Sequence, residues 1–132
     1  MAEKKVFISY DYDNDKNYKN LLLAWDGNSY FDFSFDTSAD VSVDSTDADA
    51  ITGDITARIN YSTYLLCIIG KKTYKSAWVK WEISKAVELG KKIVAVKIHS
   101  SNTLPDEIVG VGASWAMDFR FESIKAAIDN VK

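Results

Sequence analysis

The sequence predicts one α/β domain of the doubly wound, flavodoxin-like kind, with a parallel five-stranded sheet between two layers of helices. Short apolar runs, typical of strands buried on both faces, alternate along the chain with amphipathic helical patterns. Right-handed crossovers between such strands favour the strand order 2-1-3-4-5. Because 132 residues is a common size for a single domain, residues 4–132 are assigned to one domain.

The first half of the chain is predicted to contain two strands and two helices. Residues 6–8 form an apolar run, and Asn14 or Asp15 can cap the helix that follows. Residues 30–35 alternate aromatic and polar side chains, the pattern of a strand at a sheet edge. An acidic, serine-rich loop over residues 36–47 leads to the second helix. The apolar residues at helical spacing are Tyr18, Leu21, Leu22 and Trp25 in the first helix, and Ile51, Ile55 and Ile59 in the second.

The second half is predicted to contain three strands and two helices. The apolar runs at 65–69 and 93–98 are the third and fourth strands. Between them Ser76 can cap a helix that reaches residue 89, and Gly90 can end it. The remaining elements are a short fifth strand near residues 115–117 and a last helix over residues 121–131.

Composition excludes several classes of partner. Sixteen basic against nineteen acidic residues give a net charge of -3, without the basic excess that nucleic-acid binding requires. No apolar run approaches the ~20 residues that span a bilayer, and the N-terminus lacks the pattern of a signal peptide. We therefore expect a cytoplasmic protein without nucleic-acid or membrane partners. The single Cys67 lies in an apolar run and is predicted to be a small buried side chain.

The predicted fold places a ligand site beyond the carboxyl ends of the first and third strands. Open parallel sheets bind ligands at this point, where the strand order reverses. The candidate binding residues are Ser9, Tyr10 and Asp11 after the first strand, Asp36 after the second, and Lys71 after the third.

Several familiar uses of this fold are excluded by the same loops. A flavin or phosphate loop needs Gly, Ser or Thr after the first strand, but Asp11, Asp13 and Asp15 stand there. No dinucleotide or P-loop motif occurs, and the third strand is not followed by the aspartate of a phosphoacceptor receiver domain. One Cys and one His give no zinc spacing. The sequence therefore predicts neither a metal nor a bound cofactor.

The third helix carries the remaining candidates, Trp78 and Glu82. They stand at i and i+4, on one stripe of a helix that starts at the ligand-binding end of the third strand. Glu82 is predicted at the border of the core, where partial loss of water would strengthen its effect on a developing cation. The neighbouring apolar stripe is Val79, Ile83, Ala86 and Val87.

Three stretches in order carry a resemblance to a known family. Val-Phe-Ile-Ser-Tyr at residues 6–10 is similar to its first strand, and residues 55–70 are similar to its second helix and third strand. Trp78 and Glu82 match its W-x-x-x-E pattern, with a serine two residues before the tryptophan. On these grounds the chain resembles the TIR domain family, and more closely the TIR-like branch of prokaryotic Thoeris antiphage defence. The loop at 36–40 lacks the Arg-Asp and Pro-Gly signature of animal and plant members, and the C-terminal Phe-Trp box is absent.

The resemblance implies a function for Glu82. In catalytic members the matching glutamate acts in cleavage of the bond between nicotinamide and ribose of NAD, so NAD is expected as substrate. The product would be ADP-ribose or a cyclic form that signals to a downstream effector. Family members commonly assemble, so self-association is expected. Ser9, Tyr10, Asp11, Asp36, Lys71 and Trp78 are the predicted substrate-binding residues, with Lys71 or Lys72 near the phosphates.

Other interpretations stay open from the residues alone. A glutamate in the first turns of a helix is favoured by the helix dipole without any catalytic role, Trp78 can serve packing, and Asp11 can cap the first helix. The alternative functions are a non-catalytic TIR-like interaction module and a module that only binds a nucleotide.

Overall fold

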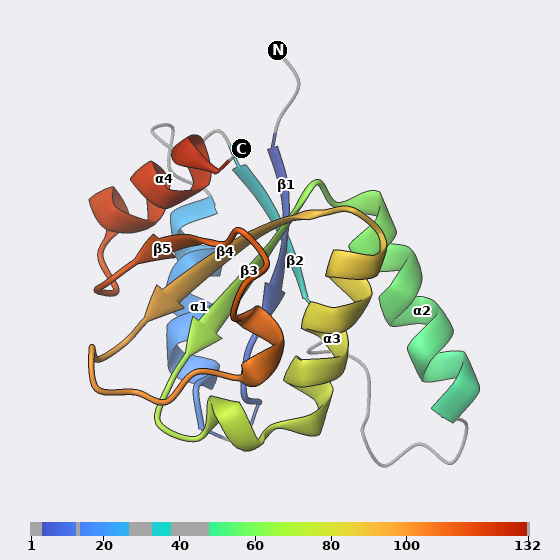
Figure 1. The fold of residues 1–132 in the computed structure, drawn as a ribbon. Coiled ribbons are helices and arrows are strands. Elements are labelled where there is room, and N and C mark those ends of the chain that lie inside the picture. The colour runs from blue at the N-terminus through green and yellow to red at the C-terminus, as the bar shows by residue number, and fades with distance from the viewer. Residues whose placement is uncertain (1–3, 13, 27–32, 38–47, 132) are drawn as a thin grey trace.

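The sheet has five parallel strands in the order β2-β1-β3-β4-β5, as predicted (Figure 1). The structure is a computed structural model and describes residues 4–12, 14–26, 33–37 and 48–131. β1 pairs with both β2 and β3, so the order of the strands reverses between β1 and β3. The strands are β1 (Lys4–Ser9), β2 (Phe33–Thr37), β3 (Tyr64–Ile69), β4 (Lys92–Lys97) and β5 (Ser114–Ala116).

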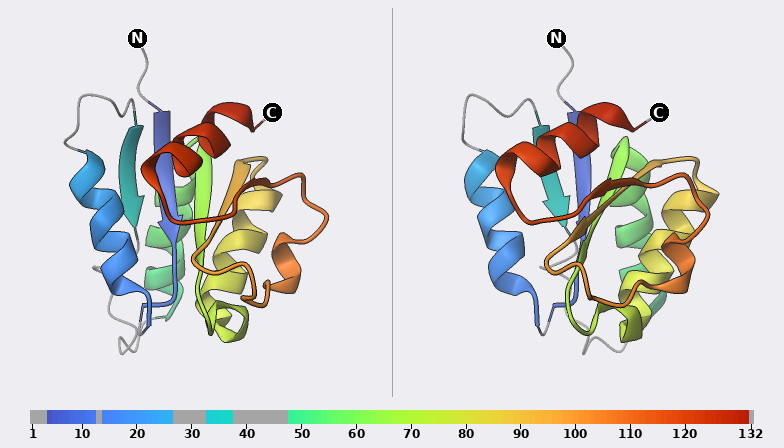
Figure 2. Two further views of the ribbon diagram at one scale, coloured as in Figure 1. Left: turned by 90° about the vertical axis from the view of Figure 1, so that its left-hand side faces the viewer. Right: turned by 60° about the vertical axis from the view of Figure 1, so that its left-hand side comes forward.

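Helices cover both faces of this sheet. α1 and α4 pack on one face, and α2 and α3 on the other (Figure 2). The helices are α1 (Lys16–Asp26), α2 (Ala48–Tyr61), α3 (Ala77–Glu88) and α4 (Phe121–Asn130), and two short 3-10 helices are η1 (Thr73–Lys75) and η2 (Asp106–Ile108). The predicted doubly wound α/β class is therefore confirmed. No helix in the described part of the chain is long and apolar enough to cross a membrane.

Alternation along the strands divides the core into two clusters. In β1, Phe7 packs towards α2 and α3, whereas Val6 and Ile8 pack towards α1 and α4. All six residues of β3 are buried, because helices cover this central strand on both faces. Cys67 is fully buried within it, as predicted. The next residue of β1 after Ile8 is Ser9, whose side chain therefore points towards α2 and α3.

β2 extends further than the sequence predicted. Asp36 was expected to open the loop after the second strand, but Asp36 and Thr37 pair with Phe7 and Ile8 of β1 and belong to β2. Pairing with β1 keeps the backbone extended, although aspartate has a low strand propensity. The first part of the predicted strand, at residues 30–32, and most of the predicted loop, at 38–47, lie outside the described residues.

The limits of α3 agree with the predicted capping signals. Ser76 is its N-cap, and its hydroxyl accepts the Val79 N–H over 3.3 Å. Gly90 follows the helix in the left-handed conformation with φ +73°, which costs glycine little. The prediction of a buried apolar stripe is wrong for one residue, because Val87 is 42% exposed. Its neighbour Ala86 is fully buried, and Leu89 packs against the same cluster, so Val87 lies on a side of the helix that is turned away from the sheet.

Candidate active site

Ser9 of β1 and Glu82 of α3 form a hydrogen-bonded pair inside the molecule. The Ser9 hydroxyl donates to Glu82 Oε1 over 2.8 Å, and the two residues are only 0% and 2% exposed. Ser9 ends β1 and stands beside Cys67 of β3 in the parallel register. The pair therefore lies where the strand order reverses, which is the predicted ligand-binding end of the sheet.

The burial of Glu82 is deeper than the sequence predicted. A position at the border of the core was expected, yet the side chain lies inside it. Val79 and Ile83, on either side of Glu82 along the helix, are fully buried against the sheet and hold this face of α3 inward. Two half-buried tryptophans, Trp78 and Trp81, pack beside the same cluster with their ring centroids 5.9 Å apart. Glu82 consequently needs Ser9 as an internal donor, because water has little access to it.

Two carboxylates lie near the end of β3. Burial raises the pKa of the Cys67 thiol, and the negative charges of Glu82 and Asp15 raise it further. The thiol therefore stays protonated, which makes Cys67 an unreactive core residue. Glu82 is bonded to Ser9, which pairs with Cys67 of β3, and Asp15 is bonded to Thr73 just beyond β3, although Glu82 belongs to α3 and Asp15 precedes α1.

Asp15 ties the loop after β1 to the loop after β3. The Gly70 N–H donates to Thr73 Oγ1 over 2.8 Å, and the Thr73 hydroxyl lies 3.2 Å from Asp15 Oδ2. Asp15 and Thr73 are 5% and 0% exposed. On the first loop, Asn14 Nδ2 also donates to Asp11 Oδ2 over 2.6 Å. These bonds fix both loops at the candidate site.

The titration of Asp15 gives a prediction about stability. Burial raises the pKa of its carboxyl, the hydrogen bond from Thr73 opposes this, and the charge of Asp11 adds to the rise. The folded state thus binds this proton more tightly than the unfolded state does. The proton on Asp15 therefore stabilises the folded state fully below about pH 4, the ordinary pKa of an aspartate. This stabilisation is lost as pH rises through the raised pKa of Asp15. The free energy of unfolding is measured by urea titration at several pH values across this range. We expect the Asp15→Asn variant to lack the decrease that the titration of Asp15 causes in the wild type.

Asp129 provides the control for this prediction. Hydrogen bonds from Lys125 and Lys4 lower the pKa of its carboxyl. The ionised carboxylate therefore stabilises the folded state above the ordinary pKa of an aspartate, and this stabilisation is lost as pH falls through the lowered pKa of Asp129. Asp129→Asn should therefore change the free energy of unfolding at acid pH. It should not change the decrease with rising pH that is assigned to Asp15. A profile in which Asp15→Asn behaves like wild type would contradict the assignment.

The other candidates on the first loop, Tyr10 and Asp11, are both buried. Tyr10 is 6% exposed and packs in the cluster beneath α1 and α4, on the opposite face of the sheet. Its ring lies 5.7 Å from Lys19 Nζ. Asp11 is 8% exposed and its backbone carbonyl accepts the Asp15 N–H over 2.8 Å. The structure thus joins Ser9 to Glu82 and places the Tyr10 side chain in the cluster on the other face of the sheet, and the binding roles of Tyr10 and Asp11 stay predictions.

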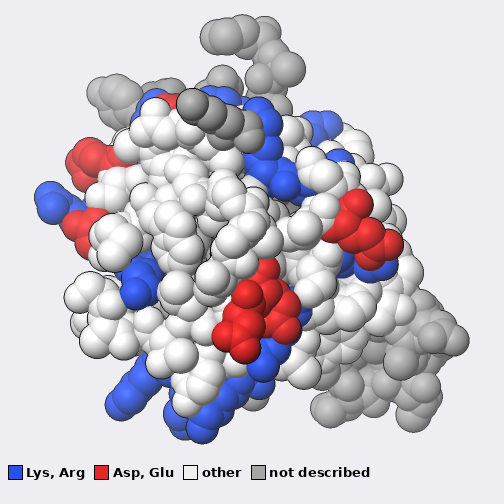
Figure 3. Space-filling model, in the orientation of Figure 1, with Lys and Arg blue, Asp and Glu red and all other residues white. Residues whose placement is uncertain are grey.

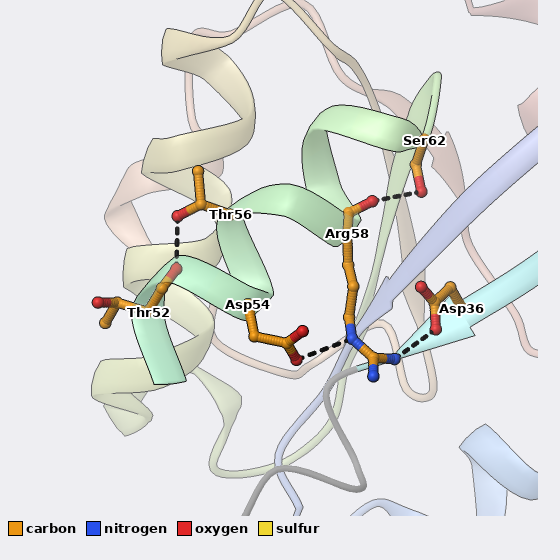
Figure 4. Close-up of polar contacts among 6 residues, drawn as sticks. All are labelled: Asp36, Thr52, Asp54, Thr56, Arg58 and Ser62. Carbon is orange, nitrogen blue, oxygen red and sulfur yellow. Dashed lines mark hydrogen bonds and ion pairs between the residues drawn. The ribbon is translucent and has the colours of Figure 1, made fainter. Parts of the chain in front are cut away.

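Asp36 is held by a basic residue of α2. Arg58 Nη1 lies 2.9 Å from Asp36 Oδ1, and Arg58 Nε lies 3.0 Å from Asp54 Oδ2 (Figure 4). The same helix ends near Ser62, whose hydroxyl donates to the Arg58 carbonyl over 3.0 Å. Through Arg58, α2 is joined to the carboxyl end of β2.

Lysines gather beyond the end of β3. Lys71, Lys72 and Lys75 are all exposed, and Figure 3 shows basic side chains along the lower end of the molecule, towards which the strands point in Figure 1. This placement suits contact with an anionic ligand. The binding roles of Lys71 and Trp78 stay predictions. Within the residues that the structure describes, no group of three or more His, Cys, Asp or Glu side chains could hold a metal ion.

The sequence placed Thr73 among the loop residues after the third strand, without a binding role, and it did not indicate Asp15 or Arg58 as site residues. Asp15 was interpreted only as a helix cap or as a repulsive charge. Arg58 carries no local signal, since one basic residue on an amphipathic helix usually lies on its solvated face.

Comparisons with known proteins give one family and several related folds. The family model of the TIR-like domain of Thoeris protein ThsB matches residues 7–103. A search of curated proteins found no match.

Three solved structures have similar folds at 14–17% sequence identity. The first is a 2-deoxyribosyltransferase from Bacillus psychrosaccharolyticus, with a TM-score of 0.68 and 14% identity over 97% of this chain and 92% of that one. The second is the CMP N-glycosidase BcmB from Clostridium botulinum, with a TM-score of 0.65 and 17% identity over 96% and 98%. The third is a 2-desoxiribosyltransferase from Leishmania mexicana, with a TM-score of 0.61 and 16% identity over 93% and 95%. At these identities the likeness is one of fold.

Proposed function

Because the chain belongs to the TIR-like domain family of Thoeris protein ThsB, we propose that it cleaves the bond between nicotinamide and ribose of NAD. Glu82 is the proposed catalytic carboxylate. The observation that carries this proposal is its hydrogen bond of 2.8 Å from Ser9, at the end of the sheet where folds of this class bind ligands. Ser9 is the proposed positioning residue, because its hydroxyl fixes one oxygen of the carboxylate.

The chemistry suits a buried carboxylate. As the ribose-to-nitrogen bond breaks, its electron pair leaves with the pyridinium ring, which becomes neutral nicotinamide, and positive charge develops on the ribose. A carboxylate with little solvent around it stabilises that charge more strongly than one in water. Water then adds to the ribose and loses a proton, which gives ADP-ribose. Attack by a group of the ADP-ribose itself would give a cyclic product, and exclusion of water decides between the two.

Access to Glu82 requires a local movement. At 2% exposure, its carboxylate meets a ribose only after neighbouring side chains shift. Trp78 and Trp81 are half-buried beside it and are the proposed side chains that move. Binding of NAD or self-association would supply the free energy for this change. Self-association is therefore part of the proposal.

The related folds support chemistry of this class. Their names describe deoxyribosyl transfer and the cleavage of an N-glycosidic bond of a nucleotide. Scission of a bond between a sugar and a nitrogen is therefore compatible with this fold. The choice of NAD rests on the family alone, as do the role in antiphage defence and a downstream effector that detects the product. The cytoplasmic location stays a prediction from the sequence.

A product analysis tests the proposal. Purified protein is incubated with NAD, both dilute and under crowded conditions that promote assembly, and nicotinamide, ADP-ribose and cyclic products are separated by chromatography. We expect release of nicotinamide together with one of the two ADP-ribose products. If nicotinamide is released under none of these conditions, the proposed reaction is wrong.

The burial of Glu82 also favours a second candidate function. A carboxylate that is 2% exposed and bonded to Ser9 has the surroundings of a structural buried group. In that case the chain would be a TIR-like module that binds a nucleotide or a partner without cleaving it. Thermal unfolding with NAD and with ADP-ribose identifies this case, because a ligand that binds only the folded state raises the melting temperature even where no product forms.

A further inference from the structure

We propose that Arg58 of α2 binds the diphosphate of the nucleotide and that Asp36 occupies its guanidinium when no ligand is bound. This inference rests on the proposed function for the class of ligand, a nucleoside diphosphate. It gives Asp36 a role different from direct contact with the substrate. Asp36 becomes the internal carboxylate that a phosphate replaces.

The sheet register brings Arg58 close to the candidate active site. Asp36 stands opposite Phe7 in the parallel pairing of β2 with β1, and Ser9 lies two residues further along β1. With about 3.3 Å per residue and about 4.8 Å between strands, the Cα atoms of Asp36 and Ser9 are roughly 8 Å apart. Both side chains point towards the face covered by α2 and α3, since one bonds to Arg58 and the other to Glu82. A nucleotide with its ribose at Glu82 therefore has its phosphates within reach of α2.

The chemistry of Arg58 suits exchange of one anion for another. Its guanidinium contacts Asp36 over 2.9 Å and Asp54 over 3.0 Å (Figure 4), and its side chain is 32% exposed. Ion pairs with this much solvent contribute little to stability, so replacing one costs little. The planar guanidinium binds phosphate through two parallel hydrogen bonds. A diphosphate also carries more negative charge than the single carboxylate of Asp36.

A purely structural role would give a different pattern of effects. If Arg58 only held α2 against β2, loss of either partner would weaken ligand binding in the same direction. If Asp36 competes with the phosphates, removal of Arg58 weakens binding and removal of the Asp36 charge strengthens it. The sign of the Asp36 effect therefore separates the two interpretations.

The experiment measures ADP-ribose binding by calorimetry. We expect Arg58→Gln to weaken binding by about 10- to 100-fold, the loss of charge-assisted hydrogen bonds, and Arg58→Lys to weaken it less because the charge remains. Asp36→Asn should tighten binding by about two- to fivefold. The matched control is Arg120→Gln, since Arg120 is the other arginine of the chain, is 71% exposed in its side chain and pairs with Asp118. Thermal unfolding checks that each variant is folded.

Several outcomes would overturn the inference. They are no binding of ADP-ribose by the wild type, binding within twofold of wild type in both Arg58 variants, an equal effect of Arg120→Gln, or weaker binding in Asp36→Asn. Nicotinamide release by the wild type is measured separately. Failure of that reaction together with the expected binding pattern would reject only the proposed function. Cleavage without the pattern would reject only the role of Arg58.

Discussion

Replacing Glu82 with glutamine is expected to lower nicotinamide release from NAD by at least about 100-fold. Removal of one preorganised electrostatic contact to a developing charge costs on the order of 10²–10³ in rate, and here the whole negative charge is lost. Glutamine has nearly the same shape, and its side-chain oxygen can still accept the Ser9 hydroxyl, which now donates to Glu82 Oε1 over 2.8 Å. The Glu82→Gln variant should therefore keep the fold. Initial rates at saturating NAD then compare the turnover of the variant with that of the wild type.

The matched control for this variant is Glu88→Gln on the same helix. Glu88 pairs with Lys85 over 3.0 Å, and its side chain is 68% exposed, so the substitution removes the same charge outside the site. We expect rates within about twofold of wild type, as for a surface ion pair of small energy. A folded Glu82→Gln variant that keeps full turnover would show that the catalytic group lies elsewhere.

Replacing Gly70 with alanine is expected to destabilise the protein by about 1–3 kcal/mol, the usual cost of inserting a methyl group into a packed site. A Cβ at Gly70 would overlap both carboxylate oxygens of Asp15 and lie 2.6 Å from its Cγ. Asp15 is 5% exposed and is bonded to Thr73, which leaves its side chain little room to turn away. Urea unfolding at neutral pH measures the loss.

Gly53 of α2 is the control for Gly70. A Cβ there meets no atom within 4 Å, so Gly53→Ala should raise stability by about 0.5–1 kcal/mol through helix propensity. A double-mutant cycle tests the cause of the Gly70 effect. If the clash is with Asp15, the cost of Gly70→Ala should fall in an Asp15→Ala background. An unchanged cost in that background would place the strain in another part of the loop.

The elements of the fold were predictable because their signals are local. Alternating or continuous apolar runs predicted each strand, and Ser76 predicted the start of α3 within one residue of the observed helix Ala77–Glu88. The end of β2 was not predictable, since Asp36 and Thr37 are extended through pairing with β1 rather than through their own propensities. The exposure of Val87 likewise depends on which side of α3 is turned towards the sheet.

The candidate site was predictable only in part. The W-x-x-x-E pattern selected Glu82, and the fold class located the end of the sheet where it lies. The depth of Glu82 was not predictable, because it depends on how α3 presses Val79 and Ile83 against strands from other parts of the chain. The place of the Tyr10 side chain on the other face of the sheet follows from strand alternation, which sends neighbouring side chains to opposite faces.

By itself the sequence determined the order of strands and helices, the parallel sheet and the choice of Glu82 as the candidate residue of α3. Each of these follows from residues within a turn or a strand of one another, or from a motif of five residues. Only the tertiary structure decided which groups meet: Ser9 with Glu82, 73 positions apart, Asp15 with Thr73, 58 apart, and Asp36 with Arg58, 22 apart. These contacts depend on strand register and helix placement, which are set by packing of the whole core rather than by any local pattern.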